Sequence, residues 1–83
     1  MPMLQVFVAA GCNVCDHARA VARRVTEEFH EVRVDVVDID EEPERVPSTV
    51  FAVPSYVLNG AVISLGNPSW EQLSGLLGAG GAQ

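Results

Sequence analysis

The chain has 83 residues, of which 48% are hydrophobic, and it carries 11 acidic residues against five arginines and no lysine. This length supports one small domain, and the apolar fraction excludes a disordered chain. With a net charge of −6 the chain lacks the row of cations that would neutralise phosphates, so we expect no nucleic acid as partner. No apolar run reaches the roughly 18–20 residues of a membrane span, so we expect no membrane as partner either.

The first half of the chain predicts a βαβ unit. Residues 3–8 form a nearly continuous apolar run, which is typical of a strand covered on both faces. From Asn13 the apolar period becomes helical. The predicted buried face of this helix consists of Val14, Ala18, Val21, Ala22, Val25 and Phe29. Residues 32–39 are rich in β-branched side chains and predict a second strand, parallel to the first after a right-handed crossover.

The middle of the chain predicts a short helix and a hairpin. Residues 40–44 resemble an acidic helix start, but Pro47 interrupts it, so we expect one or two helical turns over residues 47–51. Asn59 and Gly60 stand between two apolar runs and predict a type I′ turn, because both residues tolerate positive φ angles. The strands predicted on either side of this turn cover residues 55–58 and 61–65.

The last predicted element is a helix that Asn67 caps and Gly78 ends. Its predicted buried face consists of Trp70, Leu73, Leu76 and Leu77. We expect the domain to span residues 1–78 and residues 79–83 to form a flexible C-terminal tail.

Cys12 and Cys15 are the only cysteines of the chain, and they lie where the first predicted strand turns into the first helix. As a structural staple the pair would be weak, because closing a four-residue loop stabilises a fold by only about 2 kcal/mol. A tetrahedral zinc site needs two further ligands, for which only His17 and His30 are available. The spacing therefore leaves two interpretations, namely redox chemistry or transient capture of a soft metal ion.

The start of a helix changes the chemistry of a cysteine placed there. The first N–H groups of a helix are unpaired and carry partial positive charge, which stabilises a thiolate relative to a thiol. Cys12 lies at this start and can be exposed to solvent, whereas we expect Cys15, one turn further in, to be better shielded. This predicts attack by Cys12 and resolution by Cys15. Asp16 and His17 follow directly as an ordinary first-turn carboxylate and a solvated helix histidine, and a role of either in tuning the thiol stays open.

The CxxC pair at a strand–helix junction, with Val53 and Pro54 opening a later hairpin, resembles the thioredoxin superfamily, and the small size is most similar to glutaredoxin-like and minimal thioredoxin-like proteins. The resemblance covers residues 3–77. It implies a single-domain α/β fold of the order β-α-β-(short α)-β-β-α, with a four-stranded mixed sheet and helices on both faces. It also implies that Pro54 is cis and faces the cysteine pair, and that the backbone of Val53 hydrogen-bonds an extended substrate.

The function that this resemblance implies is thiol–disulfide exchange through a mixed-disulfide intermediate. Cys12 and Cys15 are then the catalytic residues, Val53 and Pro54 bind substrate, and no cofactor or metal is expected. The expected partners are disulfide-containing proteins or small thiols, together with a reductase or thiol reductant. We expect a monomer in the cytoplasm.

Two other functions stay open. A soft-metal carrier for Cu(I) or Hg(II) of the ferredoxin-like type also places two thiolates after its first strand, although its βαββαβ order ends on a strand. A non-catalytic binding module of the thioredoxin fold is the second alternative, because a fold by itself does not fix function. Ala10 and residues 66–69 stand where glutaredoxins have groups that help to hold glutathione, and they lack those groups, so no glutathione-binding residue is assigned.

Overall fold

All the predicted strands meet in one sheet in the computed structural model, which describes residues 2–81. The elements in chain order are β1 (Met3–Val8), α1 (Asn13–Glu28), β2 (Arg33–Asp38), the 3₁₀ helix η1 (Pro43–Arg45), β3 (Ser55–Leu58), β4 (Ala61–Leu65) and α2 (Trp70–Gly81). The strand order is β2-β1-β3-β4, in which β1 runs parallel to β2 and the other neighbours are antiparallel. The predicted α/β fold with a four-stranded mixed sheet is confirmed.

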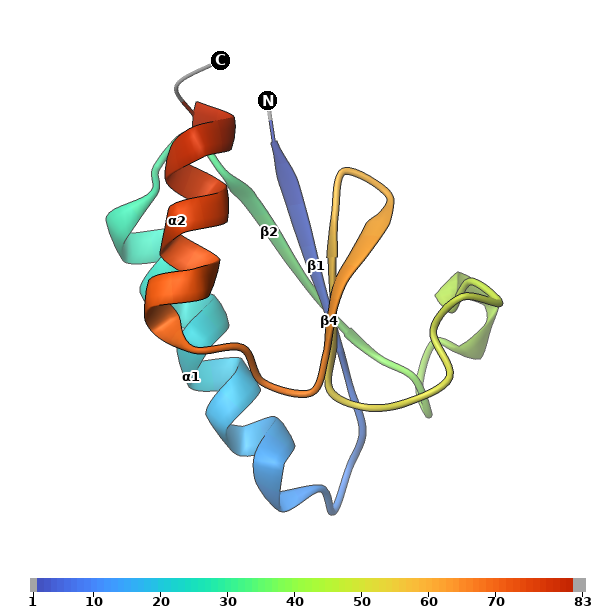
Figure 1. Ribbon diagram of the computed structural model, residues 1–83. Helices are drawn as coiled ribbons and strands as arrows, with labels where there is room; N and C mark the ends of the chain where they lie inside the picture. Colours follow the sequence, from blue (N-terminus) through green and yellow to red (C-terminus); the bar gives the residue numbers. More distant parts are fainter. Residues whose placement is uncertain (1, 82–83) are drawn as a thin grey trace.

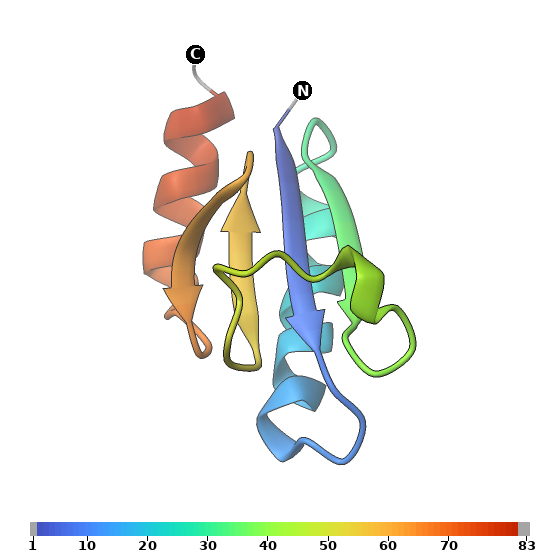
Figure 2. The same cartoon turned by 90° about the vertical axis from the view of Figure 1, so that its right-hand side faces the viewer.

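The two faces of the sheet are covered differently. Helices α1 and α2 both pack on one face (Figure 1). The opposite face is crossed by the chain between β2 and β3, which includes η1 and is seen in front of the sheet in Figure 2. The helix on this second face is therefore only the short 3₁₀ turn.

The alternation of side chains along β1 divides the core in two, because successive residues of a strand point to opposite faces. The larger part, here called the helix-side core, consists of Leu4, Val6, Val8, Cys15, Ala18, Val21, Ala22, Val25, Val32, Tyr56, Leu73 and Leu77. The smaller part, the loop-side core, consists of Phe7, Val37, Val50 and Val57. The cysteine pair therefore begins at the end of a strand that is buried on both sides.

Two positions predicted to be buried on the helices are exposed instead. Val14 is 54% exposed, and the buried Cys15 takes the place expected for it in the first turn of α1. Both residues lie within one turn of Ala18, at i−4 and i−3, and the docking of α1 selects Cys15. Leu76 is 41% exposed, because α2 buries the i, i+4 pair Leu73 and Leu77 and turns Leu76 away from the sheet.

Trp70 is partly buried at the contact between the two helices. The centroids of the Trp70 and Phe29 rings lie 6.2 Å apart. The guanidinium carbon of Arg24 lies 3.9 Å from the centroid of the Trp70 ring. Arg24 also pairs with Glu28 at 2.7 Å. This stacking joins the second half of α1 to the first turn of α2.

The short helix predicted over residues 47–51 is wrong, since the helical turn is η1 and lies earlier in the chain. Pro43 is at its first position, where a missing N–H costs nothing. Val46 precedes Pro47 and is extended, with φ −91° and ψ 111°. A residue before proline disfavours the helical region, so the turn ends there.

The predicted hairpin is confirmed, and the predicted end of the last helix is not. Asn59 and Gly60 have φ angles of 51° and 87°, as a type I′ turn requires. Helix α2 continues past Gly78 to Gly81, because Gly78 does not adopt the left-handed conformation that ends many helices. Residues 82–83 of the predicted tail lie outside the described residues. Among the helices within residues 2–81, none has the length and apolarity that crossing a bilayer requires.

Candidate active site

The loop after β1 presents the cysteine pair at one end of the sheet. Gly11 has a φ angle of 72°, which side chains rarely tolerate, and it turns the chain directly before Cys12. Cys12 is extended and precedes the first residue of α1, and its carbonyl accepts the N–H of Cys15 at 3.1 Å. The Sγ atoms of Cys12 and Cys15 form a disulfide, with their Cα atoms 5.1 Å apart.

The two sulfurs of the pair differ in burial. Cys15 is fully buried in the helix-side core, whereas Cys12 is partly exposed and packs against its edge. The Cys12 side chain makes no capping hydrogen bond within the described residues. Cys12 is therefore the sulfur that a reactant can reach, next to N–H groups at the positive end of α1.

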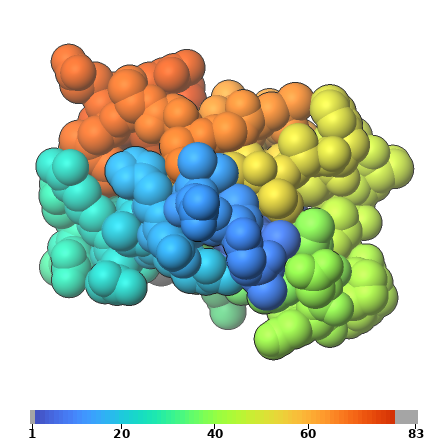
Figure 3. Space-filling view, turned by 90° about the horizontal axis from the view of Figure 1, so that it is seen from below, coloured from blue at the N-terminus to red at the C-terminus, as the bar shows by residue number. Residues whose placement is uncertain are grey.

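Pro54 lies at the same end of the sheet as the cysteine loop, because β3 runs antiparallel to β1 with Ser55 opposite Phe7. The Val53–Pro54 peptide bond is cis, as the resemblance implied. Cys12 and Val53 both pack against the helix-side core. Figure 3 shows the blue β1–α1 segment next to the yellow segment that leads into β3.

The backbone around Pro54 is unevenly used. Pro54 is buried, and its carbonyl accepts the N–H of Gly66 at 2.7 Å. Val53 is only partly buried, and neither its N–H nor its C=O bonds another backbone group within residues 2–81. The backbone groups of Val53 are therefore free of ladder hydrogen bonds beside the cysteine loop.

Asp16 and His17 are both exposed on the first turns of α1. The Asp16 carboxylate pairs with Arg19 at 3.3 Å, and Arg19 also lies 3.9 Å from the Asp38 carboxylate. The positive charge of Arg19 therefore offsets the negative charges of Asp16, in the first turn of α1, and of Asp38, at the end of β2. Within residues 2–81 no group of three or more His, Cys, Asp or Glu side chains is placed to hold a metal ion.

Asn67 has a structural role that the sequence did not indicate. Its predicted role as the N-cap of α2 is wrong, because the Ser69 hydroxyl accepts the N–H of Gln72 at 3.1 Å. The Asn67 amide instead donates to the carbonyl of Val14 at 2.9 Å, and its Oδ1 accepts the hydroxyl of Tyr56 at 2.8 Å. Burial raises the pKa of Tyr56 to about 12, so the hydroxyl stays a neutral donor at physiological pH. This bridge ties β3 to the turn between the two cysteines.

We expect Asn67→Ala to lower the free energy of unfolding by about 1–3 kcal/mol, because it leaves the buried Tyr56 hydroxyl unpaired. In urea unfolding, the double variant Tyr56→Phe/Asn67→Ala should lose at least about 0.5 kcal/mol less than the sum of the two single losses. Strictly additive losses would show that the bridge contributes nothing of its own.

The comparisons with known proteins agree on one family. The model of a family described as "Thioredoxin domain" matches residues 3–78. A thioredoxin from Methanocaldococcus jannaschii is 31% identical over 72 residues, which cover 84% of this chain and 85% of that protein. The similarity therefore extends over the cysteine pair, Pro54 and the hairpin.

Three solved structures are similar in fold. A mutant thioredoxin from Halobacterium salinarum has a TM-score of 0.80 at 24% identity, covering 94% of this chain and 73% of that chain. Oxidised mitochondrial thioredoxin 3 from Saccharomyces cerevisiae has a TM-score of 0.76 at 25% identity, covering 94% and 77%. A malarial protein has a TM-score of 0.77 at 16% identity, covering 95% and 96%.

Proposed function

The chain belongs to the thioredoxin domain family, and from this membership we propose that it reduces disulfide bonds of other proteins through the dithiol of Cys12 and Cys15. The observation that carries the proposal is the unequal burial of the pair. One sulfur is reachable at the start of α1, and the other is enclosed directly behind it. A structural staple has no need of this asymmetry, whereas disulfide exchange needs a nucleophile and a resolving thiol.

The exchange proceeds in two displacements. The Cys12 thiolate attacks one sulfur of the target disulfide, so that a Cys12–target disulfide forms and the other target sulfur leaves as a thiolate. The Cys15 thiolate then attacks Cys12, which forms the Cys12–Cys15 disulfide and releases the second target thiolate. The target gains two electrons and takes up two protons from solvent, and the chain becomes oxidised. An external dithiol or thiol reductant then reduces the Cys12–Cys15 disulfide again.

The target polypeptide binds in an extended form beside Val53 and Pro54. The N–H and C=O of Val53 have no backbone partner within the described residues and lie at the same end of the sheet as Cys12, so they suit a strand-like segment. The buried Pro54 holds this backbone in place through its carbonyl bond to Gly66. Small disulfides make no such contacts and are the poorer substrates.

The working cycle requires a reducing partner. We place the chain in the cytoplasm, because a dithiol is regenerated there by reductases or by the glutathione pool. We also propose that it acts as a monomer.

The proposal is tested by turnover of a protein disulfide such as that of insulin, with either NADPH and thioredoxin reductase or glutathione as reductant. We expect the chain to accelerate reduction well above the reductant alone with one of these two systems. If neither system nor a chemically reduced sample transfers electrons to the target, the proposal is wrong. A Cu(I) titration of the reduced protein then decides whether the two thiolates serve a soft-metal carrier.

A further inference from the structure

Strand β2 forms an open edge of the sheet. Its only strand neighbour among residues 2–81 is β1, and Figure 2 shows β2 at the border of the sheet. The pairing with β1 runs in one unbroken register, and β2 contains no proline or lysine, which are among the features that protect an edge from further pairing. The other edge strand, β4, is less regular, because its pairing with β3 contains a register shift. The edge of β2 is therefore the better suited of the two to accept another strand.

The backbone of β2 presents four hydrogen-bonding groups at this edge. In a parallel pair, alternate residues direct both their N–H and their C=O towards the neighbouring strand. Arg33 donates its N–H to the carbonyl of Pro2, on the β1 side, at 2.8 Å, so Arg33 and the other odd-numbered residues of β2 face β1. The N–H and C=O of Val34 and Val36 therefore point away from β1, where β2 has no neighbouring strand within the described part of the chain.

A groove runs between this edge and helix α1. Its volume is about 360 Å³, and it is lined by residues of α1 and by the two valines of the edge, namely Arg19, Ala22, Arg23, Thr26, Val34 and Val36. Val36 is 42% exposed. A strand added beside β2 would cover this apolar side chain, which gives the contact a hydrophobic contribution besides its hydrogen bonds.

The charge around the edge is opposite in sign to that of the whole chain. The chain has a net charge of −6, and three of its five arginines form ion pairs with its own carboxylates. The two arginines without such a pair among residues 2–81 are Arg23 and Arg33, and both are exposed. Arg23 lines the groove on the helix side, whereas Arg33 alternates with Val34 along β2 and points to the other face. The two cations therefore flank the edge from both faces.

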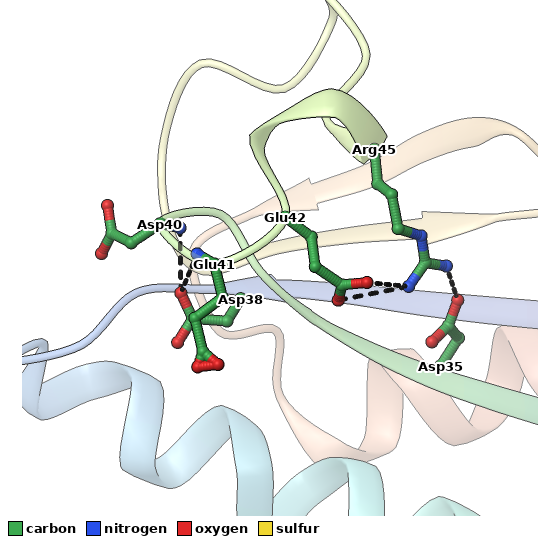
Figure 4. Close-up of polar contacts among 6 residues, drawn as sticks. All are labelled: Asp35, Asp38, Asp40, Glu41, Glu42 and Arg45. Atoms are coloured by element: carbon green, nitrogen blue, oxygen red, sulfur yellow. Dashed lines mark hydrogen bonds and ion pairs between the residues drawn. The ribbon is translucent and has the colours of Figure 1, made fainter.

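The carboxylates of β2 itself do not neutralise these two arginines, because both carboxylates are engaged elsewhere (Figure 4). Asp35 pairs with Arg45, and Asp38 accepts the backbone N–H groups of residues 40–41 at 2.9 and 3.3 Å. Asp38 also lies 3.9 Å from the guanidinium group of Arg19. The charge that remains available to a partner along β2 is therefore positive.

We propose that the open edge of β2 binds an extended acidic segment of another protein, which joins the sheet as an added strand. The backbone of this segment pairs with the N–H and C=O groups of Val34 and Val36, and an apolar side chain covers Val36 in the groove. Its carboxylates face Arg23 and Arg33. A second β2 is the poorer occupant, because its own carboxylates are engaged and each copy carries a charge of −6. A nucleic acid has no amide backbone that could pair with the edge.

This surface is separate from the candidate active site. Arg33 stands opposite Met3, at the start of β1, whereas the cysteine loop follows Val8, at the end of β1. Arg23 lies in the second half of α1, away from the cysteine pair at its start. A partner bound at this edge leaves Cys12 reachable, so the inference goes beyond the proposed function and does not depend on it.

Two labelled peptides that differ only in the charge of their ends test the preference. Both have a central alternation of threonine and valine, with two glutamates at each end of one peptide and two lysines at each end of the other. By fluorescence anisotropy at about 0.15 M salt, where the Debye length is about 8 Å, we expect the glutamate peptide to bind about tenfold more tightly. The net charge of −6 by itself favours the lysine peptide, so equal or tighter binding of the lysine peptide would overturn the inference.

Two variants of equal net charge locate the contact. Arg23→Gln/Arg33→Gln removes the two cations, whereas Ser48→Glu/Gln72→Glu adds two carboxylates at exposed positions elsewhere. We expect the first variant to lose the preference for the glutamate peptide and the second to retain it. An equal loss in both variants would show that the preference follows the net charge of the protein, which refutes the edge as the binding site.

Hydrogen exchange of single amides tests whether the peptide adds as a strand. With saturating glutamate peptide, the N–H groups of Val34 and Val36 should exchange at least about tenfold more slowly, because each then has a carbonyl partner. The N–H of Arg33 already donates to Pro2 and is the internal control, which should change little. Binding without protection of the two valine amides would show attachment through charge alone and would contradict strand addition.

Turnover of a protein disulfide separates this inference from the proposed function. We expect neither saturating glutamate peptide nor Arg23→Gln/Arg33→Gln to change the turnover. Inhibition by the peptide would place it at the cysteine pair and refute the edge as its site. If turnover is absent but the glutamate peptide binds preferentially, the proposed function fails and this inference holds. Self-association of the protein that the peptide reverses would make a second copy the occupant, which overturns the inference.

Discussion

Cys15→Ser is expected to accumulate disulfide-linked complexes with target proteins in near-stoichiometric amounts. Cys12 remains reachable and attacks as before, but the variant has no thiol that can release the target from the mixed disulfide. The complexes are measured as bands on a non-reducing gel that disappear on addition of a dithiol. Turnover of a protein disulfide by this variant should fall to the level of the free reductant.

Cys12→Ser is the matched control, because it retains one cysteine at the same turn. We expect it to form almost no complexes, since the remaining sulfur of Cys15 is fully buried. If this variant forms complexes as readily as Cys15→Ser, the assignment of Cys12 as the attacking sulfur and Cys15 as the resolving sulfur is wrong.

In the reduced wild-type protein, Cys12 should be alkylated by iodoacetamide at least about a hundredfold faster than Cys15. The Cys15 sulfur reacts only after the start of α1 opens, and an opening free energy of about 3 kcal/mol corresponds to about this ratio. Cys12 needs no such opening, and the N–H groups of α1 favour its thiolate. The two rates are obtained by mass spectrometry of peptides from a time course.

The same time course in concentrated urea provides the control for alkylation. Once α1 is unfolded, neither burial nor the helix start distinguishes the two sulfurs, so the rates should agree within a small factor. A native-state ratio near one, or faster alkylation of Cys15, contradicts the geometry from which the roles of the pair are inferred.

The sequence was sufficient for those features that depend on neighbours in the chain. The continuous apolar run of β1, the helical period after Asn13 and the Asn59–Gly60 turn each follow from local rules, and the structure confirms them. The cis bond before Pro54 could be expected only from the resemblance, because a strand-start proline is equally compatible with trans by local rules.

The features that the sequence did not indicate depend on distant contacts. Whether Val14 or Cys15 enters the core is decided by how α1 docks on the sheet, and helical periodicity alone allows both. Asn67 followed by proline has the local pattern of an N-cap, yet its amide bonds a carbonyl 53 residues away. Residues 46–54, which bring Val53 and Pro54 beside the cysteine loop, have no regular structure, so periodicity gives no signal for their course.

The contacts of the Trp70 ring with Arg24 and Phe29 determine what the intrinsic fluorescence of this protein reports. Trp70 is the only tryptophan of the chain, and its partner Arg24 follows Cys15 by nine residues, or about 14 Å along the axis of α1. A disulfide quenches tryptophan emission at short range, whereas the ring of Trp70 contacts Arg24 and Phe29, at the other end of α1 from the cysteines. The emission of this chain therefore follows the docking of α2 on α1, and it separates folding from oxidation state in one sample.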